Sequence, residues 1–196
     1  MFEFGVTLMV KKSQLSSVGL QAVLLRATRL HFVYIAAFMA SIIVFDSWNL
    51  ITHQAVANFW TAAVALLVIN TVFWYLARTP SRNGSLYRTL IILLILADIV
   101  FASLTIYWER GIASSSVILF AVPIITSAML RSRSTLLATA ALSAAGYPLA
   151  SVRYYYLHYG ESFRVELYGE VGFFCAVFFI LAGLLLAIDK STKSDS

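Results

Sequence analysis

The sequence predicts an all-α, polytopic membrane protein with six transmembrane helices and both termini in the cytoplasm. Of the 196 residues, 61% are hydrophobic and only 12% are charged, and the mean hydropathy is +0.86. Soluble domains contain about 25% charged residues. A soluble protein of this composition would expose large apolar patches, which promote aggregation. A lipid bilayer is therefore the expected surrounding, and the plasma (cytoplasmic) membrane is the expected location.

Six apolar segments carry the transmembrane prediction, since a membrane-spanning helix needs about 20 mostly apolar residues. The third is centred on the stretch LLILADIVFASL, and the fourth is short. The fifth is rich in Ala, Ser and Gly, so we expect it to pack centrally, because small residues let membrane helices approach closely. The segments lie at about residues 30–47, 55–77, 87–108, 115–130, 135–153 and 167–188.

Residues 30–188 thus form the predicted six-helix bundle, and 189–196 a cytoplasmic tail. Residues 1–29 form a predicted cytoplasmic N-terminal segment. Within it, residues 14–29 combine scattered apolar side chains with nearby Lys and Arg, a pattern typical of an amphipathic helix that lies in the membrane interface. A disordered tail is the alternative for this segment.

The distribution of basic residues predicts the orientation, because Lys and Arg are retained on the cytoplasmic side. Eleven of the 14 basic residues fall on the side that holds both termini. The opposite side carries only Arg110, Arg153 and Arg164. An even number of spans agrees with this bias, because it returns the chain to the side on which it started.

Two prolines fall inside predicted spans, and each removes one backbone hydrogen bond and favours a kink. Pro123 lies in the middle of the fourth span and Pro148 near the outer end of the fifth. Either is a packing kink or a candidate hinge.

Asp98 is the only acidic residue near the centre of a predicted span. A charged aspartate there costs about 2.5–3.5 kcal/mol on insertion scales, so it must be paired, hydrated or protonated. No Lys or Arg lies at its depth, and His31 falls at the inner end of the first span. The available neutral donors are Asn70, Thr126, Ser127, Ser143 and Tyr147. Asp98 either fixes helix register or forms a proton- or ligand-responsive site.

A second group of candidates lies at the outer face, where ionisable residues gather around the predicted loops. Arg153 ends the fifth span and is a candidate partner of Glu170, just inside the sixth. The remaining members are Glu109, His53 and His158. The group is either a solvated surface with a few ion pairs or an extracytoplasmic ligand site. No spacing typical of a metal, a cofactor or a catalytic centre occurs, and the single cysteine excludes an intramolecular disulfide.

Residues 97–145 are similar to part of the six-span membrane domain found at the N-terminus of some bacterial sensor histidine kinases. The resemblance rests on the mid-helix Asp98, the outer loop ERGIASSS (109–116), Pro123, the basic turn RSRS (131–134) and the following stretch LLATAALSAA. Arg110-Gly111 stands where the family has paired glycines. No kinase segment follows the sixth span, so the resemblance implies output through another protein or through oligomerisation.

Three functions remain open at this point. The first is a sensor-like or regulatory membrane domain that signals through a protein partner. The second is a structural subunit of a membrane assembly, and the third is a small proton-coupled transporter or channel. We expect the bilayer and a protein partner or second copy as binding partners. We expect neither nucleic acid binding nor enzymatic activity.

Overall fold

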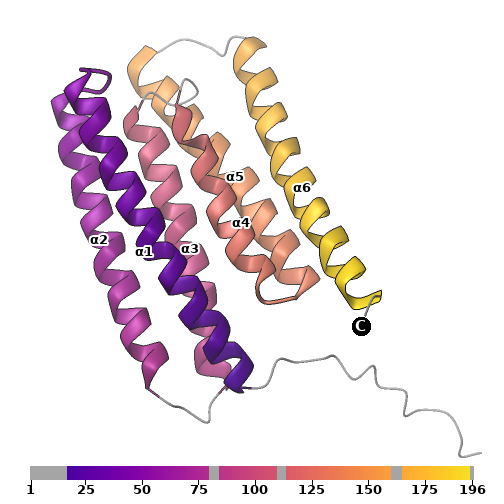
Figure 1. The fold of residues 1–196 in the computed structure, drawn as a ribbon. Coiled ribbons are helices and arrows are strands. Elements are labelled where there is room, and N and C mark those ends of the chain that lie inside the picture. Colours follow the sequence, from indigo (N-terminus) through magenta and orange to yellow (C-terminus); the bar gives the residue numbers. More distant parts are fainter. Residues whose placement is uncertain (1–16, 80–83, 110–113, 160–164, 195–196) are drawn as a thin grey trace, which may run out of the picture.

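The computed structural model describes residues 17–79, 84–109, 114–159 and 165–194, and these residues are helical apart from short turns and caps. The helices run up and down side by side (Figure 1). They are α1 (Ser17–Ser47), α2 (His53–Arg78), α3 (Gly84–Glu109), the 3-10 helix η2 (Ser115–Phe120), α4 (Ala121–Ala128), α5 (Arg133–Tyr159) and α6 (Val165–Ser194). The predicted all-α fold class is confirmed.

The six passes match the six predicted spans. Helices α1, α2, α3, α5 and α6 are each long and apolar enough to cross a bilayer, whereas η2 and α4 together make one shorter apolar pass, Ser115–Ala128. This pass corresponds to the fourth span, which is also the short one in the sequence. Its first turns wind as a 3-10 helix, and α4 begins two residues before Pro123. The proline therefore lies at a helix start, where its missing N–H is tolerated. Pro148 lies inside α5 without ending it.

The structure differs from the sequence expectation at both ends of the bundle. Helix α1 begins at Ser17 and has 31 residues, so the expected boundary between residues 29 and 30 falls inside one continuous helix. Leu24 and Ala27 are buried in the bundle, and the Gln21 side-chain amide donates to the Ala77 carbonyl of α2. Residues 17–29 are therefore part of the first helix of the bundle and pack against its neighbours. Helix α6 likewise continues past 188 to Ser194.

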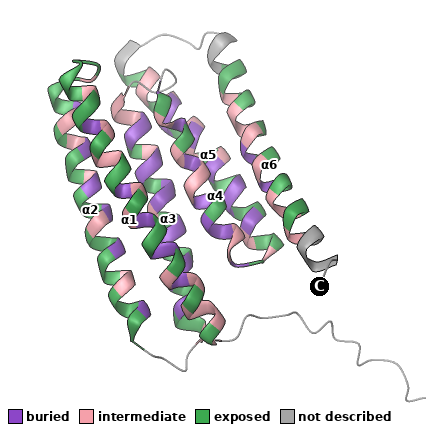
Figure 2. Ribbon diagram, in the orientation of Figure 1, coloured by how far each residue is buried: buried purple, intermediate pink, exposed green. Residues whose placement is uncertain are grey.

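Helix α3 is the centre of the bundle, because it packs against α1, α2, η2, α4 and α5. Of its most apolar stretch 56% is buried, against 39% for α5 and 11% for α6. Figure 2 shows the same contrast between α3 and the largely exposed α6. The fifth span, which was expected to pack centrally, contacts α3, α4 and α6 as α5, but α3 is the more buried helix.

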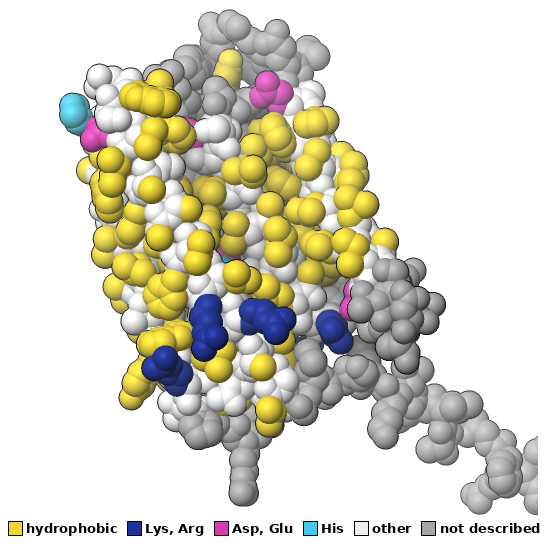
Figure 3. All heavy atoms as spheres, in the orientation of Figure 1, with side chains coloured by type: hydrophobic (Ala, Val, Ile, Leu, Met, Phe, Trp, Pro, Cys, Tyr) yellow, Lys and Arg dark blue, Asp and Glu magenta, His cyan; other side chains and the backbone are white. Residues whose placement is uncertain are grey.

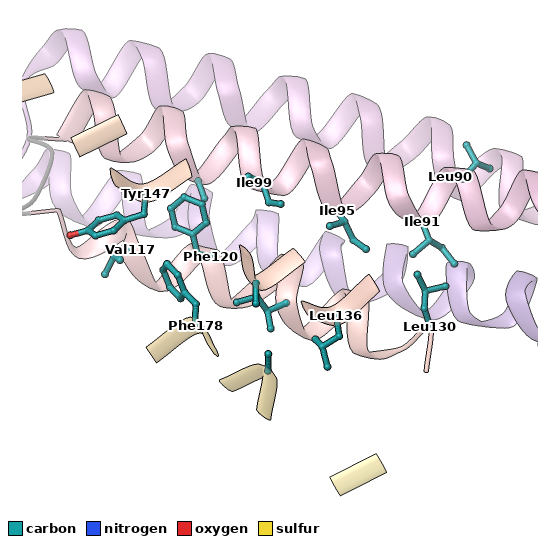
Figure 4. Packing of buried hydrophobic residues seen from close by; sticks show 14 of the residues in the cluster. Leu90, Ile91, Ile95, Ile99, Val117, Phe120, Leu130, Leu136, Tyr147 and Phe178 are labelled. Carbon is teal, nitrogen blue, oxygen red and sulfur yellow. The ribbon is translucent and has the colours of Figure 1, made fainter. Parts of the chain in front are cut away.

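Two packed regions flank α3. The larger apolar cluster joins α3 mainly to η2, α4, α5 and α6, and Figure 4 shows its members Ile95, Ile99, Phe120, Tyr147 and Phe178. Two smaller clusters join α3 to α1 and α2 around Ile35 and Ile42. The candidate site described next lies between α1 and α3, on the second side.

Candidate functional site

The candidate site is a contact between His31 of α1 and Asp98 of α3, deep inside the bundle. The distance from His31 Nε2 to Asp98 Oδ2 is 2.7 Å, and the two side chains are 3% and 1% exposed. Each residue lies fourteen positions after the first residue of its helix. Because α1 and α3 run in the same direction (Figure 1), this equal spacing brings the two side chains to the same depth.

The imidazole geometry fixes how many protons the pair holds. His31 Nδ1 lies 2.8 Å from the Ala27 carbonyl oxygen. A carbonyl oxygen only accepts, so Nδ1 carries a hydrogen. Nε2 and Oδ2 therefore share one further proton, since without it two acceptors would face each other at 2.7 Å. The pair has no net charge whether that proton lies on Nε2 or on Oδ2.

Polar atoms without partners surround the pair. Asp98 Oδ1, Asn70 Oδ1 and the Tyr34 hydroxyl are buried and form no hydrogen bond among the described residues. The Asn70 amide donates to the Thr28 carbonyl, which lies one turn before His31. The Tyr34 ring packs edge-on against the His31 ring, with centroids 6.0 Å apart. Burying a polar atom without a hydrogen bond costs free energy. These three atoms could each form a further hydrogen bond if the packing around the pair changed.

In the described part of the chain, none of the other expected donors forms a hydrogen bond with Asp98. Ser127 donates to Ile124 of its own helix, and Thr126 is buried in α4. Ser143 and Tyr147 lie one turn apart on α5, and the Tyr147 ring packs against Phe174. The expectation that neutral donors alone are available to Asp98 is wrong, because His31 is its hydrogen-bond partner.

The outer-face candidates do not form one cluster in the structure. Glu109 ends α3 and accepts hydrogen bonds from the hydroxyls of Ser114, Ser115 and Ser116. The Arg153 guanidinium lies 5.9 Å from the Tyr107 ring centroid, and no ion pair with Glu170 forms among the described residues. His53 begins α2. The side chain of His158 lies outside the described residues.

Comparison with known families matches residues 18–195 to the PilS-like transmembrane domain (6TM_PilS). The chain belongs to this family. The match covers nearly all of the sequence and fits the six-span bundle. No curated protein and no solved structure matches the chain. The suspected resemblance to the membrane domain of sensor histidine kinases is confirmed, and this PilS-like domain is a membrane domain of the sensor type.

His31 is the residue of the PilS-like domain that sequence reasoning missed. Its signal is visible in hindsight, because His31 belongs to a set of buried α1 positions that recur at helical spacing: Leu24, Ala27, Thr28, His31, Ile35 and Ile42. A histidine on such a stripe faces the bundle. In the described part of the chain, no group of three or more His, Cys, Asp or Glu side chains is placed to hold a metal ion.

Proposed function

We propose that this PilS-like domain passes a signal to a partner protein through a change in the packing of α1 against α3, and that the His31–Asp98 pair holds the resting arrangement. The observation that carries the proposal is the 2.7 Å contact between His31 Nε2 and Asp98 Oδ2, which joins two helices through residues 67 positions apart in sequence. This pair is a buried ion-pair contact between two different helices. A rearrangement that separates it exposes two groups that must find new partners.

Such a pair favours two distinct packings of α1 against α3, one with the pair closed and one with it open, over a continuous series of intermediate packings. While the proton is shared, the two side chains satisfy each other in a region from which water is excluded. If the pair opens, each group needs another donor or acceptor, and the unpaired atoms of Asn70 and Tyr34 lie nearby. A stimulus shifts the equilibrium only if it stabilises one arrangement more than the other.

Helix α1 is suited to carry the change across the bilayer. It is a single helix of 31 residues, which corresponds to about 46 Å at 1.5 Å per residue. A shift of α1 near His31 therefore moves both of its ends. With both termini in the cytoplasm, as the basic residues indicate, the N-terminal end of α1 and the C-terminal end of α6 present the change to the same compartment.

The test is cross-linking in native membranes, followed by capture of the protein and mass spectrometry. We expect one dominant partner. Asp98→Asn should change the yield or the position of the cross-link, because asparagine has no transferable proton. Thr71→Val is the matched control: the Thr71 hydroxyl is exposed and bonds only to Leu67 of its own helix.

Two outcomes contradict the proposal. Absence of any specific partner would favour a self-contained transporter. An identical partner, cross-linked at the same sites and with the same yield in wild type, Asp98→Asn and Thr71→Val, would remove the pair from signalling and leave it a structural role.

A further inference from the structure

The outer end of the bundle contains a cavity that the proposed signalling step does not use. Its volume is about 410 Å³, and it lies where the start of α2 meets the ends of α3 and α5. Cavities of this size fall within the range of small-molecule sites, roughly 300–1,000 Å³. The polar and aromatic side chains that line it come from all three helices: Gln54, Asn58, Tyr107, Trp108, Glu109 and Tyr154.

The lining indicates the charge of the ligand. Glu109 is the one ionisable acid or base among the lining residues apart from the tyrosines, and the rest is three aromatic rings, two amides and small or apolar groups. Three serine hydroxyls and the Ser116 backbone N–H hold the Glu109 carboxylate in place. None of these donors is a cation, and no ion pair of Glu109 forms within the described ranges, so there the negative charge is available to a ligand.

The aromatic rings favour the same kind of ligand. The faces of Trp and Tyr rings attract cations, and pockets that combine several such rings bind alkylated ammonium groups. One ring already has this contact in the structure, because the Arg153 guanidinium lies 5.9 Å from the Tyr107 ring centroid. Arg153 itself is not among the residues that line the cavity.

We propose that this outer cavity binds a small organic cation, an amine or quaternary ammonium group with an apolar substituent. Trp108, Tyr107 and Tyr154 surround the cation, Glu109 neutralises it, and the amides of Gln54 and Asn58 orient the remaining polar groups.

An unbroken series of ring contacts leads from this cavity to the buried pair. Successive centroids are 6.4 Å apart for Trp108 and Phe59, 5.9 Å for Phe59 and Phe38, and 4.9 Å for Phe38 and Phe101. Phe101 then contacts Tyr34 at 6.2 Å, and Tyr34 contacts His31 at 6.0 Å. The series crosses α1, α2 and α3. This inference rests on the proposed function in one respect: it makes the organic cation the stimulus that the domain reads.

Binding is tested with the full chain in lipid nanodiscs by calorimetric titration. The probe is benzyltrimethylammonium, compared with neutral benzyl alcohol and anionic benzoate. We expect saturable binding of the cation alone. Trp108→Leu and Glu109→Gln should each weaken it roughly tenfold, since each removes one of the interactions with the charge. Trp48→Leu and Glu170→Gln, both exposed at the outer end, should bind as the wild type does.

Because Glu109→Gln also alters the serine contacts, Asn58→Trp provides a second variant, whose larger side chain occupies part of the cavity without replacing Glu109. It should abolish binding while the thermal unfolding midpoint stays close to that of the wild type. Equal binding of benzyl alcohol or benzoate, or binding that is unchanged in Trp108→Leu and Asn58→Trp, would overturn the proposal. The titration involves no partner protein, so its failure is distinguishable from failure of the cross-linking test.

Discussion

A carboxylate in the middle of a membrane helix is expensive because the bilayer core offers no water to solvate its charge. The structure lowers this cost by pairing Asp98 with His31, so that the two side chains together carry no net charge. His31 and Asp98 share one proton over 2.7 Å, and Nδ1 is satisfied by the Ala27 carbonyl. The remaining free-energy cost comes from buried polar atoms that form no hydrogen bond among the described residues, and Asp98 Oδ1 is one of them.

The two members of the pair should respond differently to substitution. Asp98→Asn keeps a neutral group that donates to Nε2, so we expect normal accumulation and fold. His31→Leu leaves both oxygens of Asp98 without a partner, and the free energy of unfolding should fall by about 1–3 kcal/mol. Reversible unfolding in mixed micelles, followed by circular dichroism, measures both changes.

The double variant His31→Leu/Asp98→Leu is the control for this comparison. It replaces the pair with apolar side chains, and such replacements are often neutral or stabilising, so it should recover most of the loss seen in His31→Leu. If Asp98→Asn is instead the more damaging single change, the pair is held together by full charges.

The position of the shared proton is open to direct measurement. The uncharged tautomer, with the proton on Asp98, is favoured in the membrane interior because two separated ions lose more solvation. We therefore expect a carboxylic acid C=O stretching band in the infrared spectrum, absent in Asp98→Asn and still present in Glu170→Gln. A wild-type spectrum without this band would place the proton on His31.

At the scale of elements, Gly146 of α5 lies in close contact with α3. A Cβ atom added there would lie 3.0 Å from the Ser103 hydroxyl oxygen and 3.4 Å from Phe120. Ser103 in turn donates to the Ile99 carbonyl of its own helix. The lack of a side chain at Gly146 is therefore what lets the small-residue helix α5 lie directly against the central helix.

Gly146→Ala should accordingly destabilise the bundle by about 1 kcal/mol, as overpacked cores do. Removing the obstructing hydroxyl in Gly146→Ala/Ser103→Ala should restore most of that loss. Gly183→Ala is the matched control, because nothing lies within 4 Å of the added Cβ. Thermal unfolding in micelles gives all three values. Equal destabilisation by Gly146→Ala and Gly183→Ala would mean that the cost is not set by the contact with Ser103.

For the whole molecule, hydropathy was enough to predict the six passes, because lipid requires long apolar helices whatever their neighbours are. It could not predict packing. The position of His31 was misjudged because Gln21, Arg26 and Arg29 lower the hydropathy before residue 30, although the helix continues through them. The central place of α3 was missed for a related reason. Its Leu and Ile side chains suit lipid and protein contacts equally, so composition does not distinguish the two.

The orientation of the bundle is a prediction of the whole molecule, since it depends on charges from several helices. Arginines gather at the end where α1 begins, whereas several acidic side chains lie at the other end, which shows no Arg or Lys in this view (Figure 3). Retention of basic residues on the cytoplasmic side places that end inside.

In a Cys175→Ala background, Ser134→Cys and Ser47→Cys mark the two ends, and both positions are exposed. A membrane-impermeant maleimide should label Ser47→Cys in cells with an intact inner membrane. It should label Ser134→Cys only after that membrane is permeabilised. The reverse pattern would invert the bundle, place both termini outside and move the proposed cation site to the cytoplasmic face.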